Sequence, residues 1–160
     1  MSKIKKLGEL KEIVESLKNE GKTIVTTNGA FDIIHFSHIN LLQKVKKLGD
    51  ISIVLINGDS SPYFKTKGPK RPIIPEKERA GMLAALECVD YIAIFNEDKP
   101  LRFLEELKPH IHSKGYQGIA PRNAEEEKLV NTWGGKLMLV NSGGTHSTTD
   151  IIKKILATAK

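Results

Sequence analysis

The sequence predicts an α/β fold: a single doubly wound, Rossmann-like domain with a parallel sheet of about five strands and helices on both faces. Segments of strand character alternate with segments of helical periodicity along the whole chain. One strand candidate, "ISIVLING", is an almost continuous apolar run, which is typical of a strand buried on both faces. The length of 160 residues suffices for one core and is short for two. We therefore expect residues 1–160 to form one domain.

The first four elements follow from local patterns. Residues 1–20 carry apolar side chains at helical spacing with charges between them, which predicts an amphipathic N-terminal helix and not a signal peptide. Residues 22–29, "KTIVTTNG", alternate β-branched side chains and end at Asn-Gly, as a strand that runs into a turn. Residues 37–48 predict a helix with Ser37 as candidate N-cap and a glycine after its end. The buried strand at 51–58 comes next.

The second half continues the alternation. A polar, lysine-rich loop spans residues 59–74, and Pro75 is well placed in the first turn of a helix that continues to Val89. The remaining predicted elements, alternately strand and helix, are 90–95, 100–107, 110–115, 123–133, 135–141 and 147–159.

Composition narrows the class of protein. Hydrophobic residues make up 39% and charged residues 28% of the chain, and no run approaches the roughly 18 apolar residues of a membrane span. We expect a cytoplasmic protein without a membrane partner. The net charge is +6, but Lys and Arg are interleaved with Glu, so we expect no nucleic-acid partner. The densest basic stretch, "KTKGPKR" at 65–71, favours a site for a small phosphorylated ligand. Cys88 is the only cysteine and is expected to be a buried structural thiol within a helix.

The unusual residues follow the predicted strands, where a doubly wound sheet binds its ligands. His35 and His38 are three apart at a helix start and therefore point to one side. As zinc ligands they would need another protein ligand, and none stands at a recognisable spacing. They could also be helix-start histidines bonded to backbone or water. Alternatively, together with Gly29 and the helix N-terminus, they form a phosphate site.

Two short stretches and the run between them resemble one superfamily. Residues 29–38 read "GAFDIIHFSH", which resembles the G-x-F-D-x-x-H-x-G-H signature of the cytidylyltransferase-type nucleotidyltransferases. Residues 144–155 read "GTHSTTDIIKKI", which is similar to that superfamily's second signature. The run at 57–92 resembles the heptose-1-phosphate adenylyltransferases, in a stand-alone form without the kinase domain. Two departures stand out: Ser37 replaces the glycine of the first signature, and "KGYQG" at 114–118 lacks the aspartate common after Lys-Gly in heptose-specific relatives.

The resemblance implies an activity. A nucleoside monophosphate would pass from ATP to a sugar 1-phosphate, most nearly D-glycero-D-manno-heptose 1-phosphate, with release of pyrophosphate, giving ADP-heptose for surface polysaccharide synthesis. One alternative is a cytidylyltransferase that uses CTP and glycerol phosphate or a similar phospho-alcohol. Another is a non-catalytic, nucleotide-binding regulatory domain. The resemblance also implies Mg²⁺ bound mainly through the nucleotide phosphates, a separate sugar kinase acting upstream, and a homo-oligomer.

The same resemblance implies roles for single residues. The implied catalytic residues are His35, His38, Lys67 and Arg79. The implied nucleotide-binding residues are Asn28, Gly29, Ala30, Phe31, His35, His38, Lys114, Gly115, Ser147, Thr148 and Thr149. The implied substrate-binding residues are Asp32, Asp59 and Lys67, with turn or capping roles open for both aspartates and with Lys65 and Lys70 as competitors of Lys67. His146 is a candidate third contact, and His110 and His112 match nothing in the family and are expected to be structural. No protein metal ligand is assigned.

Overall fold

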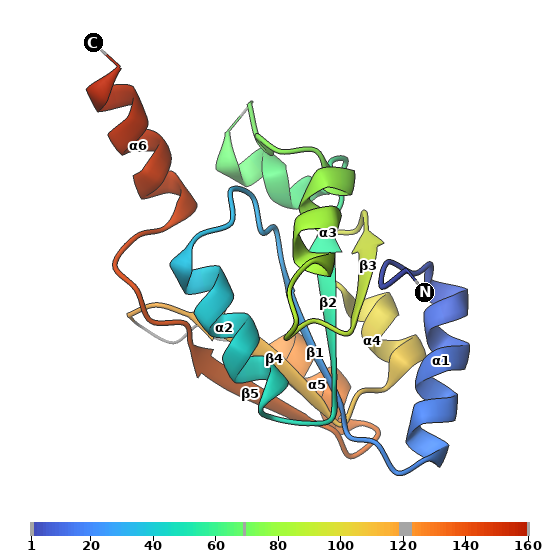
Figure 1. Cartoon of the computed structure of the whole chain (residues 1–160). Helices are drawn as coiled ribbons and strands as arrows, with labels where there is room; N and C mark the ends of the chain where they lie inside the picture. The colour runs from blue at the N-terminus through green and yellow to red at the C-terminus, as the bar shows by residue number, and fades with distance from the viewer. Residues whose placement is uncertain (1, 69, 119–122, 160) are drawn as a thin grey trace.

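The computed structural model describes residues 2–68, 70–118 and 123–159. Its centre is one sheet of five strands in the order β3-β2-β1-β4-β5, with every pair of neighbours parallel (Figure 1). The strands are β1 Ile24–Gly29, β2 Ile51–Asn57, β3 Tyr91–Phe95, β4 Ile111–Tyr116 and β5 Lys136–Asn141. The predicted α/β fold with a parallel sheet is confirmed.

Helices cover both faces of the sheet. The bounds are α1 Leu7–Asn19, α2 Phe36–Lys46, α3 Glu76–Ala84, α4 Leu101–Leu107, α5 Ala124–Asn131 and α6 Thr148–Thr158. Buried side chains of α1, α4 and α5 pack together on one face of the sheet. Those of α2 and α3 pack on the other. Strand side chains alternate between these clusters, so that Ile53 joins the first and Val54 the second, as the two-residue period of a strand requires.

The first residues differ from the expected helix. Ile4 forms a parallel bridge with Ile92 of β3, and α1 begins only at Leu7. Lys5 N donates to Ile92 O, and Ile92 N donates to Lys3 O, each at 2.9 Å. Because β3 lies at the edge of the sheet, these bonds satisfy backbone groups that would otherwise be open.

The helix predicted at 75–89 is too long. The helix α3 ends at Ala84, and two turns follow, closed by Leu86 N to Leu83 O and Val89 N to Leu86 O. These turns bring Val89 into the core while the chain reverses toward β3, which a continued helix would prevent. Cys88 therefore lies half-buried in a turn and not in a helix, and burial raises the pKa of its thiol.

The order of the strands creates an opening at one end of the sheet. From β1 the chain passes outward to β2 and β3, then returns to β4 on the other side of β1. The connections leaving β1 and β4 thus diverge, which opens a crevice at their carboxyl ends. The last helix, α6, begins beside this crevice and extends away from the sheet (Figure 1), and none of its side chains is buried. No helix in the described parts of the chain is both long and apolar enough to span a membrane.

Candidate active site

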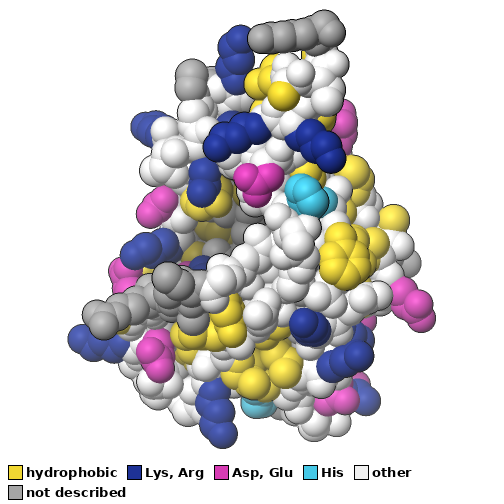
Figure 2. All heavy atoms as spheres, turned by 90° about the vertical axis from the view of Figure 1, so that its left-hand side faces the viewer, with side chains coloured by type: hydrophobic (Ala, Val, Ile, Leu, Met, Phe, Trp, Pro, Cys, Tyr) yellow, Lys and Arg dark blue, Asp and Glu magenta, His cyan; other side chains and the backbone are white. Residues whose placement is uncertain are grey.

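A cleft of about 460 Å³ occupies the crevice between β1 and β4. Its lining comes mainly from four segments far apart in the sequence: the turn after β1 with the start of α2, the basic loop, the end of β4 and the start of α6. Ser142, directly after β5, adds to the lining. The lining includes these residues singled out from the sequence: Asn28, Gly29, Ala30, Phe31, Asp32, His35, His38, Lys67, Gly115, Ser147, Thr148 and Thr149. Figure 2 shows that one face of the molecule is hollowed, with Lys and Arg side chains around the hollow.

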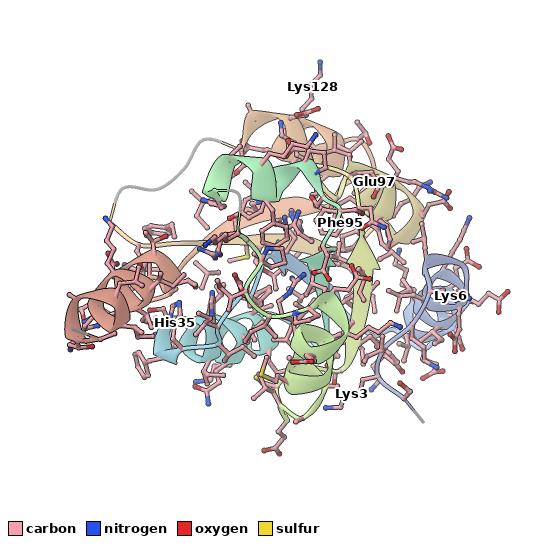
Figure 3. The ribbon with its side chains drawn as sticks, turned by 90° about the horizontal axis from the view of Figure 1, so that it is seen from above. Lys3, Lys6, His35, Phe95, Glu97 and Lys128 are labelled. Carbon is pink, nitrogen blue, oxygen red and sulfur yellow. The ribbon has the colours of Figure 1, made fainter. Side chains whose placement is uncertain are left out.

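The two histidines form a stacked pair. Their ring centroids are 3.9 Å apart with an interplanar angle of 33°, and the Phe31 ring lies 5.2 Å from that of His38. His35 is the N-cap residue of α2, on the side of the molecule where α6 lies (Figure 3). Ser37 lies inside the first turn and is not the N-cap, contrary to our expectation. The helix start therefore presents both imidazoles to the cleft.

Both imidazoles are neutral near pH 7. Burial, and next the proximity of His35, lowers the pKa of His38 to about 4, although Asp32 opposes this shift. Burial, and next His146, lowers the pKa of His35. The buried Nδ1 of His38 has no hydrogen-bond partner among the described residues. A phosphate entering the cleft would meet N–H donors, and its negative charge would raise both pKa values again.

The turn that precedes the pair is strained. Phe31 and Ile33 have φ angles of 49° and 54°, a region that costs a non-glycine residue about 1–3 kcal/mol. Thr148 Oγ1 donates to Asp32 O at 2.7 Å and so ties the turn to the start of α6. At Gly29 a Cβ would lie 3.1 Å from the Phe31 ring, so a larger residue would require that ring to shift by a few tenths of an ångström. Contacts with distant parts of the chain thus hold the backbone that carries the histidines.

The carboxylate of Asp32, which was expected to bind substrate, forms hydrogen bonds within the protein instead. It is 1% exposed and accepts hydrogen bonds from Arg71 Nε at 2.6 Å, Ile73 N at 2.9 Å and Ile74 N at 3.0 Å. These bonds join the basic loop to the strained turn. Asp32 lies at the wall of the cleft as a positioning residue, which agrees with the turn role left open above.

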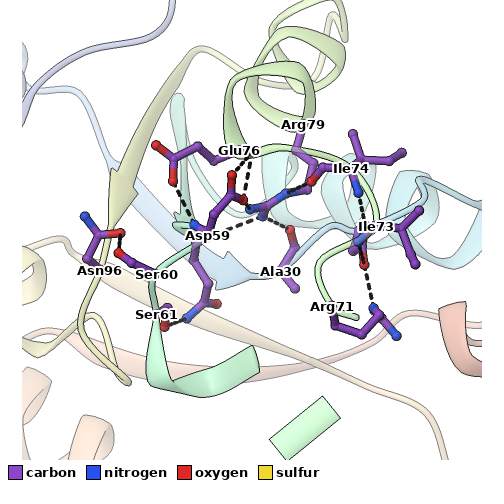
Figure 4. Close-up of polar contacts among 12 residues, drawn as sticks. Ala30, Asp59, Ser60, Ser61, Arg71, Ile73, Ile74, Glu76, Arg79 and Asn96 are labelled. Atoms are coloured by element: carbon purple, nitrogen blue, oxygen red, sulfur yellow. Dashed lines mark hydrogen bonds and ion pairs between the residues drawn. The ribbon is translucent and has the colours of Figure 1, made fainter. Parts of the chain in front are cut away.

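Arg79, one of the implied catalytic residues, is fully buried and is not among the described residues that line the cleft. Its Nη1 donates to Ala30 O at 2.6 Å and to Asn57 O at 2.8 Å, and its Nε donates to Ile74 O at 2.8 Å (Figure 4). The guanidinium thereby joins the ends of β1 and β2 to the start of α3. Its donors are taken up by backbone carbonyls, so this placement differs from the expected catalytic one.

Asp59, expected to face the acceptor, completes the same network. Its Oδ1 accepts from Arg79 Nη2 at 2.7 Å and from Glu76 N at 2.9 Å (Figure 4). Asp59 therefore caps the start of α3 and is not among the described residues that line the cleft. This is the capping role that the sequence left as an alternative.

The basic loop places one of its three lysines at the cleft. It contains a short 3-10 helix, η1 Pro62–Lys67, within the segment expected to be irregular. Lys67 lines the cleft, and its Nζ lies 5.0 Å from the centre of the Tyr63 ring. Lys65 and Lys70 are not among the described lining residues. Arg71 does line the cleft. Sequence reasoning missed it, although it ends the basic stretch "KTKGPKR".

Ser147, Thr148 and Thr149 form the start of α6 and line the cleft. Ser147 Oγ accepts from Asp150 N, and the Asp150 carboxylate accepts from Ser147 N, which makes a reciprocal capping box. Capping and ligand binding are compatible, because backbone N–H groups of the first turn remain available and attract anions. Thr149 lines the cleft with an exposed side chain.

Lys114 and Gly115, the expected nucleotide contacts in β4, line two different cavities. Gly115 lines the cleft, and a Cβ there would lie 2.5 Å from Leu41 Cδ2, so a larger residue would require the Leu41 side chain to move. Lys114 lines an adjoining cavity instead, where its Nζ donates to Asn28 Oδ1 at 2.7 Å and to Glu126 Oε1 at 2.8 Å. The cleft and the adjoining cavity share Asn28 as a lining residue, so they are neighbours.

The segment 114–118, which departs from the family pattern, contacts Ser37, the other departure. Gln117 Nε2 donates to Ser37 Oγ at 2.7 Å and to Gly143 O at 3.2 Å. Ser37 Oγ in turn donates to His146 O at 3.3 Å. The start of α2, the end of β4 and the segment before α6 are thus joined at one end of the cleft. The sequence had given Gln117 no role and Ser37 only that of a candidate helix N-cap.

A larger groove, of about 730 Å³, lies between the start of α2 and α6. Its rim carries exposed apolar side chains, with Phe36 69% and Ile155 55% exposed. Of the stacked histidines, His35 reaches this groove, whereas both reach the cleft. Lys154 also lines the groove, but the cleft brings both imidazoles together with Lys67 and Arg71 and is therefore the better phosphate site.

Comparison with known proteins gives the family. A family model described as Cytidylyltransferase-like matches residues 26–154, which include all four segments that line the cleft. The chain belongs to this family. The predicted resemblance is confirmed, and with it a nucleotidyltransferase as the class of enzyme.

Curated relatives agree with this assignment. The chain is 46% identical over 155 residues to the bifunctional protein HldE of Geobacter metallireducens, an alignment that covers 97% of this chain and 31% of the relative. It is 41% identical over 153 residues to HldE of Helicobacter pylori, covering 96% of this chain and 32% of the relative. The chain thus spans about a third of the length of these relatives.

Solved structures support the fold. The lipopolysaccharide core biosynthesis protein of Thermoplasma volcanium matches with a TM-score of 0.64 at 30% identity, covering 79% of this chain and all of that one. A pantoate–β-alanine ligase from Francisella tularensis matches with a TM-score of 0.61 at 16% identity, covering 93% of this chain and 69% of that one. The second match concerns the fold alone.

Proposed function

We propose that the chain transfers an adenylyl group from ATP to a sugar 1-phosphate, with D-glycero-D-manno-heptose 1-phosphate as the acceptor, and releases pyrophosphate. The observation that carries this proposal is the pair of imidazoles of His35 and His38, with ring centroids 3.9 Å apart, in one cleft with the first turn of α6 and Lys67. The identity with HldE proteins over nearly the whole chain supports the choice of nucleotide and acceptor. The product would be ADP-heptose.

The reaction needs positioning and charge stabilisation more than a protein nucleophile. An oxygen of the acceptor phosphate attacks the α-phosphorus, a new P–O bond forms, and the bond from the α-phosphorus to the bridging oxygen breaks as pyrophosphate leaves. Imidazole N–H groups donate to the oxygens on which charge accumulates, and the ammonium of Lys67 adds positive charge near them. Because the cleft exists before the ligand enters, little reorganisation is needed during the reaction.

Magnesium is proposed to enter with the triphosphate. In the described residues no three His, Cys, Asp or Glu side chains gather in a metal-binding group, so phosphate and water oxygens would supply most ligands. When bound, the ion would neutralise charge on the leaving pyrophosphate. An upstream kinase that phosphorylates the sugar, and association of copies of this chain, stay predictions.

The test is a matrix of nucleotides against phosphorylated acceptors, with pyrophosphate release as the readout. We expect turnover with ATP and heptose 1-phosphate, and a loss of at least about a hundredfold in kcat for His35→Asn and for His38→Asn. The matched control is His110→Asn. His110 lies at the opposite end of the sheet, where its Nδ1 accepts from Ile24 N, and an asparagine oxygen can accept the same bond.

The alternatives give different outcomes. Turnover with CTP and glycerol phosphate alone would contradict both proposed substrates while leaving the reaction class intact. ATP binding without turnover in any pairing would favour the non-catalytic regulatory domain.

A further inference from the structure

The cavity that adjoins the cleft has its own chemistry. We call it the acidic cavity; it has a volume of about 330 Å³, and its polar lining includes Asn57, Asp98, Lys114, Asn123, Glu125 and Glu126. It shares the lining residues Asn28, Gly29 and Tyr63 with the cleft, so the two cavities lie side by side. The volume is at the lower end of the roughly 300–1,000 Å³ of small-molecule sites, which suits a single sugar unit.

The charges in the acidic cavity oppose a phosphate. Its two lysines are already paired: Lys99 bonds to Glu125, and Lys114 bonds to Glu126 at 2.8 Å. Asp98 adds a further carboxylate, which leaves the described lining with a formal charge of −1. The start of α5 could attract an anion, but its first turn already carries three glutamates. The acidic cavity therefore favours an uncharged ligand rich in hydroxyl groups, which donate to carboxylates.

Two side chains are prepared for such a ligand. Glu126 is 4% exposed, and Lys114 bonds to its Oε1, which fixes the carboxylate and leaves Oε2 to accept from a hydroxyl. The buried Nδ2 of Asn123 has no hydrogen-bond partner within the described ranges. A buried amide donor of this kind is costly unless a ligand accepts its hydrogen bond. Both side chains lie on α5 or directly before it, so one helix start presents an acceptor and a donor together.

We propose that the acidic cavity binds the hydroxyl-rich, uncharged body of the acceptor, with Glu126 and Asn123 as its specificity-determining residues. This inference rests on the proposed function. The sugar occupies the acidic cavity, and its phosphate extends past Asn28 into the cleft, where it meets the α-phosphorus of the nucleotide. Phospho-alcohols with few hydroxyls would leave the bonds of Glu126 and Asn123 unmade and are poorer acceptors.

The test compares kinetic constants for acceptor and ATP in three variants. Glu126→Gln keeps the shape of the side chain and removes its charge, and we expect KM for the sugar phosphate to rise about tenfold or more, with KM for ATP unchanged. Glu127→Gln is the matched control: it removes the same charge from the same turn of α5, but Glu127 is exposed and is not among the described residues that line the acidic cavity. Asn123→Ala disrupts no ion pair, and we expect the same selective rise should Glu126→Gln fail to fold.

The outcomes separate the two proposals. If the unaltered chain releases no pyrophosphate with ATP and any sugar phosphate, the proposed function fails and this inference fails with it. If the unaltered chain turns over but KM for the acceptor is the same in Glu126→Gln, Asn123→Ala and Glu127→Gln, only the assignment of the acidic cavity is overturned. A rise in KM for ATP alone would place the nucleoside in the acidic cavity and would also overturn the assignment.

Discussion

His112 makes the fold sensitive to acid. It is fully buried as the second residue of β4, with its Nδ1 at 2.8 Å from Thr26 Oγ1 and its Nε2 without a partner among the described residues. Burial, and next the charge of Lys114, lowers its pKa from 6.5 to about 3. The folded chain therefore keeps His112 neutral at pH values where the unfolded chain protonates it. The stability that depends on a neutral His112 is fully present above about pH 6.5, and it is lost progressively as the pH falls from there toward about 3.

The magnitude follows from the shift. Each pH unit in this window costs about 1.4 kcal/mol, so lowering the pH from 7 to 5 should reduce the free energy of unfolding by about 2 kcal/mol through His112 alone. That is a large fraction of the roughly 5–15 kcal/mol that stabilises a domain. His38, with a pKa lowered to about 4, acts in the same direction.

The assay is urea unfolding of the unaltered chain and of His112→Gln at pH 7, 6 and 5. We expect the variant to lose less stability over this range, because it lacks the buried imidazole. The difference between the two proteins in the slope of unfolding free energy against pH separates the effect of His112 from the effects of His38 and the carboxylates. NMR titration of the unaltered chain provides a second measurement, in which the His112 ring should not titrate above about pH 4. Equal slopes in the two proteins, or a His112 midpoint near 6.5, would refute the reasoning.

Two further predictions concern residues whose contacts the sequence did not reveal. Arg79→Lys should lower the free energy of unfolding by about 3 kcal/mol or more, because a lysine cannot bond to all the acceptors of the guanidinium. Urea unfolding measures this change. If the variant keeps its stability in urea but loses turnover, Arg79 has a catalytic role instead. Ser37→Ala and Gln117→Ala should each destabilise the chain, with a coupling of about 1 kcal/mol in a double-mutant cycle. Additive effects of these two substitutions would show that the observed bond contributes nothing.

The parts of the fold that could be predicted are those with local causes. Alternating β-branched or apolar runs marked β1, β2, β3 and β5, and the carboxyl ends of the strands predicted where the unusual residues would meet. The end of α3 could not be predicted, because the residues after Ala84 are apolar and suit a helix. The chain turns there since Val89 must enter the core, which depends on the position of β3.

The same limit applies to the site. Arg79 stands among charged neighbours in "EKERAG" and reads as an exposed or ligand-binding residue. Its burial depends on carbonyls at the ends of two strands that lie 22 and 49 residues earlier in the chain. Asp32 likewise bonds to residues 39 to 42 positions later. A single sequence shows no signal for such pairs.

These long-range bonds explain how an unfavourable arrangement is kept in place. Left-handed Phe31 and Ile33, a buried neutral His38 and a fully buried Arg79 each disfavour folding when considered singly. The bonds of Arg79 to Ala30 and of Asp32 to the basic loop offset this cost, and they form only when the turn and the loop come together. Arg79 and Asp32, to which the family resemblance gave catalytic and substrate-binding roles, thus stabilise the backbone around the histidines. Their substitution should therefore alter turnover and stability together, whereas substitution of His35 should alter turnover alone.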